Sequence, residues 1–203
     1  VALVSNGREV KEAAEGLDLD VVLERTPFYG RAGGQVGDTG WILRQGLRFR
    51  VTDTVKYAHD LIVHQGRVEQ GAVAVGDKVE ARVDIEQRNA TALNHSATHL
   101  LHAALREVLG DHVKQAGSLV APDRLRFDFS HFTQMTSEQL TEVENIVNRH
   151  IRENLVLQTK EMPKEEAMKT GAMAIFEERY GEKVRLVSIG DGISMELCGG
   201  THT

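Results

Sequence analysis

Residues 84–110 read DIEQRNATALNHSATHLLHAALREVLG, and this stretch decides how the sequence is organised. Asp84 followed by Gln87 three positions later resembles a capping box with Asp in place of Ser or Thr. Gly110 is a natural residue just past the end of a helix. The stretch therefore predicts one long helix that ends at Gly110. Its core side is expected to consist of Leu93, Leu100, Leu101, Ala104, Leu105 and Val108.

The sequence before this helix, residues 1–83, has short apolar runs separated by glycine-bearing turns such as Gln45-Gly46 and Gly76-Asp77. Spacing of this kind favours short strands packed as a small barrel or sandwich. We therefore expect a glycine-rich β-barrel subdomain over residues 1–83. The strands expected there include 21–23, 41–43, 47–51, 61–63 and 79–83.

The sequence after the helix mixes helix and strand signals. In chain order they are a hairpin of 117–120 and 125–129, a capping box of Thr136 and Gln139, a helix with Leu140, Val143, Val147 and Ile151 on one face, a strand at 156–157, a short helix after Pro163, and strands at 184–189 and 193–197. The predicted fold class is therefore α+β. A small N-terminal β-barrel over residues 1–83 is followed by an α+β metal-binding subdomain over residues 84–203.

Composition narrows the class of protein. The 203 residues carry 30 acidic and 24 basic side chains, for a formal net charge of −6, which argues against a general polyanion binder. No apolar run approaches the ~20 residues that span a bilayer, and no signal-peptide pattern is present. A single cysteine cannot form an internal disulfide. We expect a cytoplasmic chain with no membrane or DNA partner. Because it ends one residue after His202, we also expect a segment of a longer protein.

Two histidine and cysteine pairs with equal spacing are the strongest chemical signal. His95 and His99 are four residues apart on the predicted helix, so their imidazoles share one face. Cys198 and His202 are also four apart, and the glycines between them let the backbone bend sharply. Three imidazole nitrogens and one thiolate suit Zn²⁺. The two pairs therefore predict one shared metal site.

Ser96 and His102 restrict the class of metal site and the set of its ligands. Zinc proteases place a glutamate base directly after the first histidine of His-Glu-x-x-His, and Ser96 occupies that position here. His102 is seven residues beyond His95, about 10 Å along a helix axis, so one ion is not expected to bind both. We expect His102 to pack beside the site or to orient a ligand.

Gln115 and Glu196 are the other polar candidates near the predicted site. Gln115 follows the first helix and is either a solvated loop residue or a hydrogen-bonding group for a small polar substrate. Glu196 precedes Cys198 by two residues and faces the same side of the predicted strand. An ion pair with a lysine or arginine is the favoured role for Glu196, and orienting a ligand, moving a proton or binding substrate is the alternative.

Residues 26–40, TPFYGRAGGQVGDTG, form the second unusual segment. The segment lacks the Gly-Lys-Ser/Thr ending of a P-loop, and its β-rich context argues against a dinucleotide fingerprint. We favour a set of glycine-rich turns within the barrel. The alternative is a wall that a ligand approaches closely, with Gly34 and Gln35 as substrate-binding residues and with Gln35 and Arg31 exposed.

Five motifs resemble, in order, those of the editing domain of bacterial alanyl-tRNA synthetases, over nearly the whole chain. They are TPFY…GGQVGD at 26–38, HSATHLLH at 95–102, QAGSLV at 115–120, RFDFSH at 126–131 and ELCGGTH at 196–202. Related metal sites occur in free-standing alanyl-tRNA editing proteins and in the editing module of threonyl-tRNA synthetase. Ala32 departs from the family pattern, which often has a third glycine there. It should be tolerated unless its φ is positive.

The resemblance implies an aminoacyl-tRNA hydrolase that deacylates tRNA(Ala) mischarged with serine or glycine and does not itself charge tRNA. It implies that His95, His99, Cys198 and His202 bind Zn²⁺ and that Gln115 acts at the aminoacyl group. The implied partners are the tRNA acceptor end and the rest of the synthetase in cis. Such a second site is useful because a hydrophobic pocket rejects an added hydroxyl only about 10²-fold.

Four protein ligands raise an objection, since they close a tetrahedral zinc site and closed sites are usually structural. Either one ligand, with His202 the first choice, is loosely bound, or zinc expands to five ligands, or zinc organises the pocket without contacting the attacking water. The alternative function is a structural zinc module that binds tRNA without catalysis.

Overall fold

The computed structural model describes residues 2–173 and 182–203, and the chain divides into two units, Val1–Thr91 and Ala92–Thr203. Helix α1 (Ile85–Leu109) begins in the first unit and continues in the second. The Asp84 side chain accepts a hydrogen bond from the backbone N–H of Gln87, as predicted. The second half of the expected capping box is replaced, because the N–H of Asp84 donates to the carbonyl of Thr39 at 2.8 Å.

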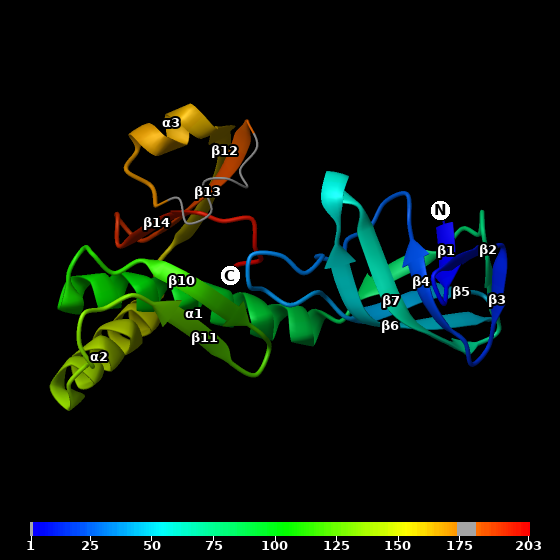
Figure 1. The fold of residues 1–203 in the computed structure, drawn as a ribbon, viewed down its shortest axis with the longest axis horizontal. Helices are drawn as coiled ribbons and strands as arrows, with labels where there is room; N and C mark the ends of the chain where they lie inside the picture. The colour runs from blue at the N-terminus through cyan, green and yellow to red at the C-terminus, as the bar shows by residue number, and fades with distance from the viewer. Residues whose placement is uncertain (1, 174–181) are drawn as a thin grey trace. The chain divides into compact units, whose positions relative to one another are not determined.

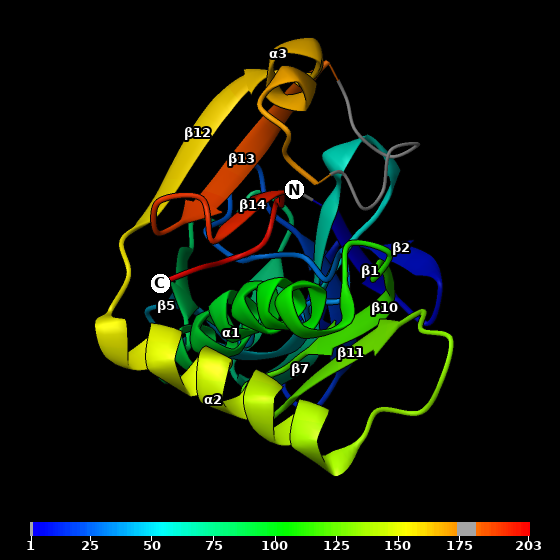
Figure 2. The same cartoon turned by 90° about the vertical axis from the view of Figure 1, so that its left-hand side faces the viewer.

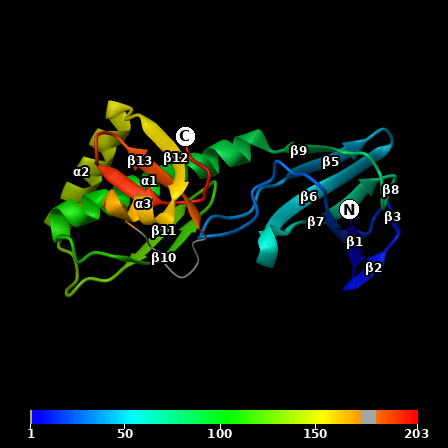
Figure 3. The same cartoon turned by 90° about the horizontal axis from the view of Figure 1, so that it is seen from above.

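The first unit is built on an antiparallel sheet of seven strands (Figures 1 and 3). The 3₁₀ turn η1 (Ala58–Asp60) connects its two longest strands, and a separate ladder pairs β3 (Glu12–Ala14) with β8 (Ala72–Ala74). In spatial order the seven strands are β2 (Arg8–Val10), β1 (Ala2–Ser5), β4 (Asp18–Val22), β7 (Ile62–Gln70), β6 (Leu47–Lys56), β5 (Gly40–Arg44) and β9 (Glu80–Val83).

The predicted closed barrel is wrong. The edge strands are β2 and β9, and no ladder joins them among the described residues, so the sheet is open. Alternating burial is the same in a curled open sheet and in a barrel, because closure depends on strand tilt and stagger rather than on the pattern along each strand. The sequence pattern therefore identified strands without identifying how the sheet ends.

The core of the first unit follows the two-residue period of its strands. In β6, Leu47, Phe49 and Val51 are buried, while Arg48 and Arg50 alternate with them on the other face. Burying side chains of this size contributes about 1.5–3 kcal/mol each. On the other face, the guanidinium groups of Arg48 and Arg50 lie 4.6 and 4.7 Å from the ring centroid of the tryptophan at position 41.

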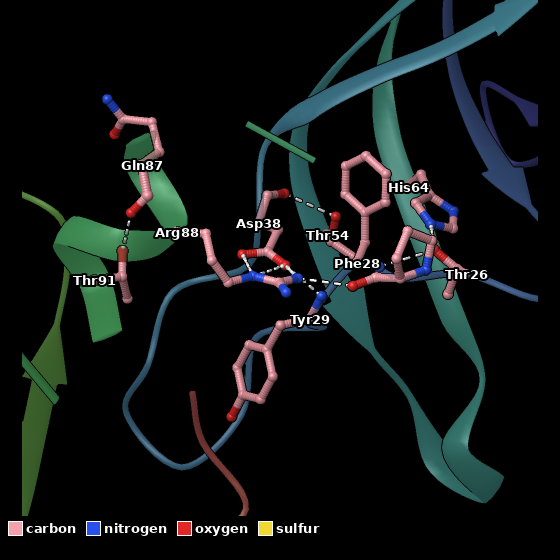
Figure 4. Close-up of polar contacts among 10 residues, drawn as sticks. Thr26, Phe28, Tyr29, Asp38, Thr54, His64, Gln87, Arg88 and Thr91 are labelled. Atoms are coloured by element: carbon pink, nitrogen blue, oxygen red, sulfur yellow. Dashed lines mark hydrogen bonds and ion pairs between the residues drawn. The ribbon is translucent and has the colours of Figure 1, made fainter. Parts of the chain in front are cut away.

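The glycine-rich segment is pinned to its surroundings by Asp38 (Figure 4). The buried carboxylate of Asp38 accepts hydrogen bonds from the backbone N–H of Tyr29 at 2.5 Å and from the guanidinium of Arg88. Arg88 also donates to the carbonyl of Pro27 at 2.7 Å. Removing one partner of a buried ion pair costs about 3–5 kcal/mol, so this contact is a strong structural tie. It supports the favoured interpretation of residues 26–40 as structural turns.

The tip of this segment is a two-residue turn of Gly33 and Gly34. Ala32 and Gln35 exchange two backbone hydrogen bonds across it, and φ is +59° at Gly33 and +92° at Gly34, which glycine adopts without strain. Ala32 is not among the described residues with positive φ, so its departure from the family pattern is tolerated as expected. Gln35 is 1% exposed, which contradicts the alternative interpretation that exposes it to a ligand. Arg31 is exposed, as in that alternative, and pairs with Asp53.

His64 is buried within the first unit and lies in the same network (Figure 4). Its Nδ1 donates to the carbonyl of Val21 at 2.9 Å, and its Nε2 is 2.7 Å from the hydroxyl of Thr26. A carbonyl only accepts, so Nδ1 carries the proton and Nε2 accepts from Thr26. Burial lowers the pKa of His64, although the hydrogen bond to Val21 opposes this shift.

The His64→Gln variant is expected to lose less stability on acidification than the wild type. Because the pKa of His64 is lowered in the folded chain, its stabilising effect is full above the unfolded value of 6.5 and falls as the pH drops below that value. One such group changes the free energy of unfolding by at most about 1.4 kcal/mol per pH unit. Urea unfolding between pH 7.5 and 5 measures this free energy for both proteins. Parallel plots of the free energy of unfolding against pH would contradict the prediction.

The second unit places α1 between two layers (Figure 2). On one side, α2 (Ser137–Glu153) and the hairpin β10 (Gln115–Val120) and β11 (Leu125–Phe129) share a core with it. On the other side is a sheet of β12 (Leu157–Pro163), β13 (Lys183–Ile189) and β14 (Ser194–Leu197), with the short helix α3 (Lys164–Lys169) packed against it. No helix in the described part of the chain is long and apolar enough to cross a membrane.

Most predicted elements of the second unit are confirmed, including the Thr136 and Gln139 capping box. The predicted helix faces are partly wrong. Leu93 is 61% exposed, and Leu140 and Ile151 are also more than half exposed. On α2 the buried residues are Val143, Ile146 and His150. The spacing of apolar residues defines a broad apolar face on a helix, and some side chains lie at its two edges. The elements that pack against the helix decide which edge is buried.

Candidate metal centre

The structure brings together the two pairs that the sequence singled out. His95 and His99 lie one turn apart on α1, and Cys198 and His202 follow β14. One donor atom from each of the four residues lies within 4.8 Å of the others. Cys198 Sγ is 3.3 Å from His95 Nε2 and 3.4 Å from His202 Nε2. A tetrahedral shell with bonds of about 2.0–2.3 Å separates its ligands by roughly 3.3–3.8 Å, so this cluster has the size of a zinc site.

The backbone around Cys198 is fixed by β13. The N–H of Cys198 donates to the carbonyl of Arg185 at 3.0 Å, and the Arg185 guanidinium donates to the carbonyl of Gly200 at 2.5 Å. The chain bends at Gly200, as expected, although neither Gly199 nor Gly200 has a positive φ. Sequence reasoning missed Arg185, because only the alignment of β13 beside β14 shows that its side chain reaches the loop after Cys198.

The carboxylate of Glu196 contacts two of the histidines on α1. Glu196 is 1% exposed, and its carboxylate accepts from His99 Nδ1 at 2.8 Å and from His102 Nδ1 at 3.1 Å. The Ser194 hydroxyl donates to the same carboxylate at 3.3 Å. The favoured prediction, an ion pair with lysine or arginine, is therefore wrong, and the ligand-orienting alternative is supported. His102 packs beside the cluster and shares its carboxylate partner, as expected.

These contacts decide which nitrogen of His99 can bind a metal. A carboxylate accepts hydrogen bonds and does not donate them, so Nδ1 of His99 carries a proton and Nε2 is the atom available to a metal. Burial alone would lower the pKa of His99, but its contacts with Cys198 and Glu196 raise that pKa to about 10, so a bound metal would displace the proton from Nε2. His99 Nε2 is buried and has no hydrogen-bond partner among the described residues, and the same is true of His202 Nδ1. Buried polar atoms without partners are costly, and a cation bound in the cluster would satisfy His99 Nε2. It would not satisfy His202 Nδ1, because His202 faces Cys198 Sγ through its Nε2. The site therefore fits a metal ion.

The electrostatics favour the ligand form of Cys198. Burial alone would raise the pKa of its thiol, but the imidazoles of His202, His95 and His99 lower that pKa to about 3. Burial likewise works against the ionised form of Glu196, and its contacts with His102 and His99 lower its pKa to about 2. A thiolate is the form that binds zinc, so the site presents its sulfur ready for coordination.

The remaining predicted site residues lie in different places. Gln115 is partly buried on β10, in the same unit as the cluster, and its Nε2 donates to the hydroxyl of Ser118 at 3.2 Å. Gly34 and Gln35 lie in the first unit, at the turn described above. Their substrate-binding roles stay predictions.

Comparisons with known proteins show which proteins this chain is similar to. The family described as "tRNA synthetases class II (A)" matches residues 1–87. The whole chain is 57% identical over 204 residues to an alanine–tRNA ligase of Halorhodospira halophila. It is 51% identical over 202 residues to the alanine–tRNA ligase of Desulfosudis oleivorans, and 53% to that of Xanthomonas euvesicatoria.

The matches cover all of this chain but only 23% of each relative. The chain therefore spans about a quarter of the length of these curated relatives. The identity extends across both units, including the part that holds the His/Cys cluster. Over its whole length, this chain is therefore similar to one segment of alanine–tRNA ligases.

Proposed function

We propose that this chain hydrolyses the ester bond of tRNA(Ala) mischarged with serine or glycine, at a zinc ion held by His95, His99, Cys198 and His202. The observation that carries the proposal is the compact imidazole and thiolate cluster in a chain similar to alanine–tRNA ligases, with His99 oriented by a buried carboxylate. Zinc bound there supplies Lewis acidity for an ester carbonyl and lowers the pKa of a bound water.

Gln115 is the proposed recognition residue for the serine hydroxyl. Its Nε2 is engaged by Ser118, which fixes the plane of the amide and leaves Oε1 to accept a hydrogen bond from the substrate. Alanine has no hydroxyl to donate, so correctly charged tRNA gains nothing from this contact. A site built to hydrogen-bond a hydroxyl can discriminate strongly against an analogue that lacks it.

The proposed partners follow from the same reaction. The substrate is the acceptor end of tRNA(Ala) carrying serine or glycine, and the rest of the synthetase acts in cis, in the cytoplasm. Glu196 is proposed to orient His99 rather than to bind substrate. The burial of Gln35 favours Gly34, at the tip of its turn, as the substrate contact of the first unit.

The test is the release of serine from tRNA(Ala) charged with radioactive serine, with alanyl-tRNA(Ala) as the protected substrate. The zinc-loaded chain should release serine and glycine and leave alanine attached. A structural zinc module is the second candidate, because four protein donors within 4.8 Å can close a tetrahedral site. A chain that binds zinc and tRNA but releases no serine would establish that alternative.

Gln115→Ala is expected to lower the rate of serine release by about 2- to 10-fold, since it removes one hydrogen bond between neutral groups, worth roughly 0.5–1.5 kcal/mol. Gln158→Ala removes an exposed glutamine of β12 in the same unit and serves as the matched control. Single-turnover deacylation at saturating protein measures both. Equal rates for Gln115→Ala and the wild type would remove Gln115 from the proposed mechanism.

A further inference from the structure

Three aromatic rings next to the β10–β11 ladder form a layered surface with one open face. Phe132 is 85% exposed, and its ring lies 4.6 Å from that of His112, with 28° between the planes. His112 Nε2 and His131 Nδ1 are 2.9 Å apart, while their ring centroids are 5.1 Å apart with 20° between the planes. These values place the two imidazoles edge to edge in nearly one plane. Phe132 therefore stacks on His112, while the His131 ring is 6.1 Å away with 46° between the planes, and Phe132 leaves most of its own surface open.

The loop that carries His112 is held firmly. An added Cβ at Gly110 would lie 3.2 Å from His112 Nδ1, so the backbone there packs closely against the imidazole. The Arg106 guanidinium donates to the carbonyls of Asp111 and Val113 at 2.6 and 3.1 Å, and Val113 itself is fully buried. Preorganised groups lose little entropy on binding, so this surface is suited to recognition.

The position of the rings connects them with Gln115. Gln115 pairs with Phe129 in the β10–β11 ladder, and the N–H of Ser130 donates to the carbonyl of Lys114 one step further. His112 just precedes β10, and His131 and Phe132 just follow β11, so the three rings lie at the end of the ladder that carries Gln115. Lys114 is exposed and adds a cation beside them.

An exposed aromatic ring supported by a second ring is a feature by which proteins bind unpaired nucleobases. Bases stack on phenylalanine and histidine rings, and each such contact contributes about 1–3 kcal/mol. The 85% exposed ring of Phe132, with His112 stacked against it, offers such a face to a base.

We propose that Phe132, supported by His112 and His131, stacks on an unpaired base near the 3′ end of the tRNA acceptor arm. The identity of the RNA rests on the proposed function, whereas the stacking contact does not depend on hydrolysis. Phe132 is a positioning residue in this assignment, because it holds the nucleic acid and not the reacting ester.

Binding of two uncharged RNA hairpins tests the proposal with the 203-residue chain. One fluorescein-labelled hairpin reproduces the tRNA(Ala) acceptor stem with its single-stranded 3′ tail, and the other ends flush with the stem. Phe132→Leu keeps an apolar side chain but removes the aromatic face, and Phe132→Tyr keeps that face. Phe132→Leu should bind the tailed hairpin about tenfold more weakly than the wild type, and Phe132→Tyr should bind it within about twofold. All three proteins should bind the flush hairpin alike.

The proposal is overturned if Phe132→Leu binds the tailed hairpin as tightly as the wild type. It is also overturned if the leucine and tyrosine variants lose affinity equally, or if Phe132→Leu weakens both hairpins by the same factor, since either result points to a contact other than base stacking. Because both RNAs are uncharged, failure of the proposed hydrolysis would show in the serine-release assay and leave this binding result unchanged.

Discussion

Replacing Cys198 with alanine is expected to lower zinc affinity about 10²- to 10³-fold and to abolish serine release. Structural zinc sites bind with about 10–16 kcal/mol in total, so one of four ligands accounts for roughly 2.5–4 kcal/mol. Cys198 supplies the only sulfur of the cluster, and its thiolate lies 3.3–3.4 Å from two of the imidazoles. Competition with a chromophoric chelator measures the affinity, and the deacylation assay measures the activity.

His99→Gln and His150→Gln form a matched pair for the same experiment. Both histidines are buried on helices, and each has its Nδ1 within hydrogen-bond distance of a glutamate, but only His99 belongs to the cluster. We expect His99→Gln to behave like Cys198→Ala and His150→Gln to bind zinc like the wild type. If Cys198→Ala binds zinc as tightly as the wild type, the cluster is not the metal site. If the variants lose zinc but still release serine at the wild-type rate, the cluster is the metal site but the metal takes no part in the reaction.

The helices and the hairpin of the second unit could be predicted because their signals are local. Thr136 and Gln139 make both hydrogen bonds of a capping box, and the turn between 120 and 125 joins the two strands expected on either side. Such signals depend on neighbours within a few residues, so they do not require knowledge of the fold.

The closure of the first sheet and the buried face of α2 could not be predicted in the same way. Whether β2 meets β9 depends on strand stagger summed across seven strands. On α2, His150 is buried while Ile151 is exposed, although hydrophobicity alone ranks them the other way. The neighbours of that helix come from distant parts of the sequence, and they override the local pattern.

The candidate site shows the same division. The four cluster residues could be predicted because each pair has helical or turn-like spacing, and donor chemistry connects the pairs. The partners of Glu196 could not, since His99 and His102 are almost a hundred positions away. The alternative interpretation of residues 26–40 exposes Gln35 to a ligand, but Gln35 is 1% exposed, which the local sequence does not indicate.

Glu196→Gln is expected to lower zinc affinity about 10- to 100-fold, the usual cost of removing the group that orients a histidine ligand. The two carboxylate oxygens of Glu196 accept separately from His99 and His102. A glutamine has one acceptor oxygen, so its NH₂ group must face one of the two Nδ1–H groups. That histidine then moves or shifts its proton to Nε2, and a proton on His99 Nε2 blocks the atom available to the metal.

Glu161→Gln is the charge-matched control, because Glu161 is an exposed residue of β12 in the same unit. Chelator competition should separate the two variants, and ¹⁵N NMR of the imidazoles should report whether the proton of His99 or His102 has moved. A variant that unfolds at lower temperature but keeps its zinc affinity and both tautomers would reduce Glu196 to a packing role. Because glutamine keeps the size of the side chain, a change in tautomer cannot be attributed to a cavity. The tautomer measurement therefore decides whether this buried carboxylate acts through His99.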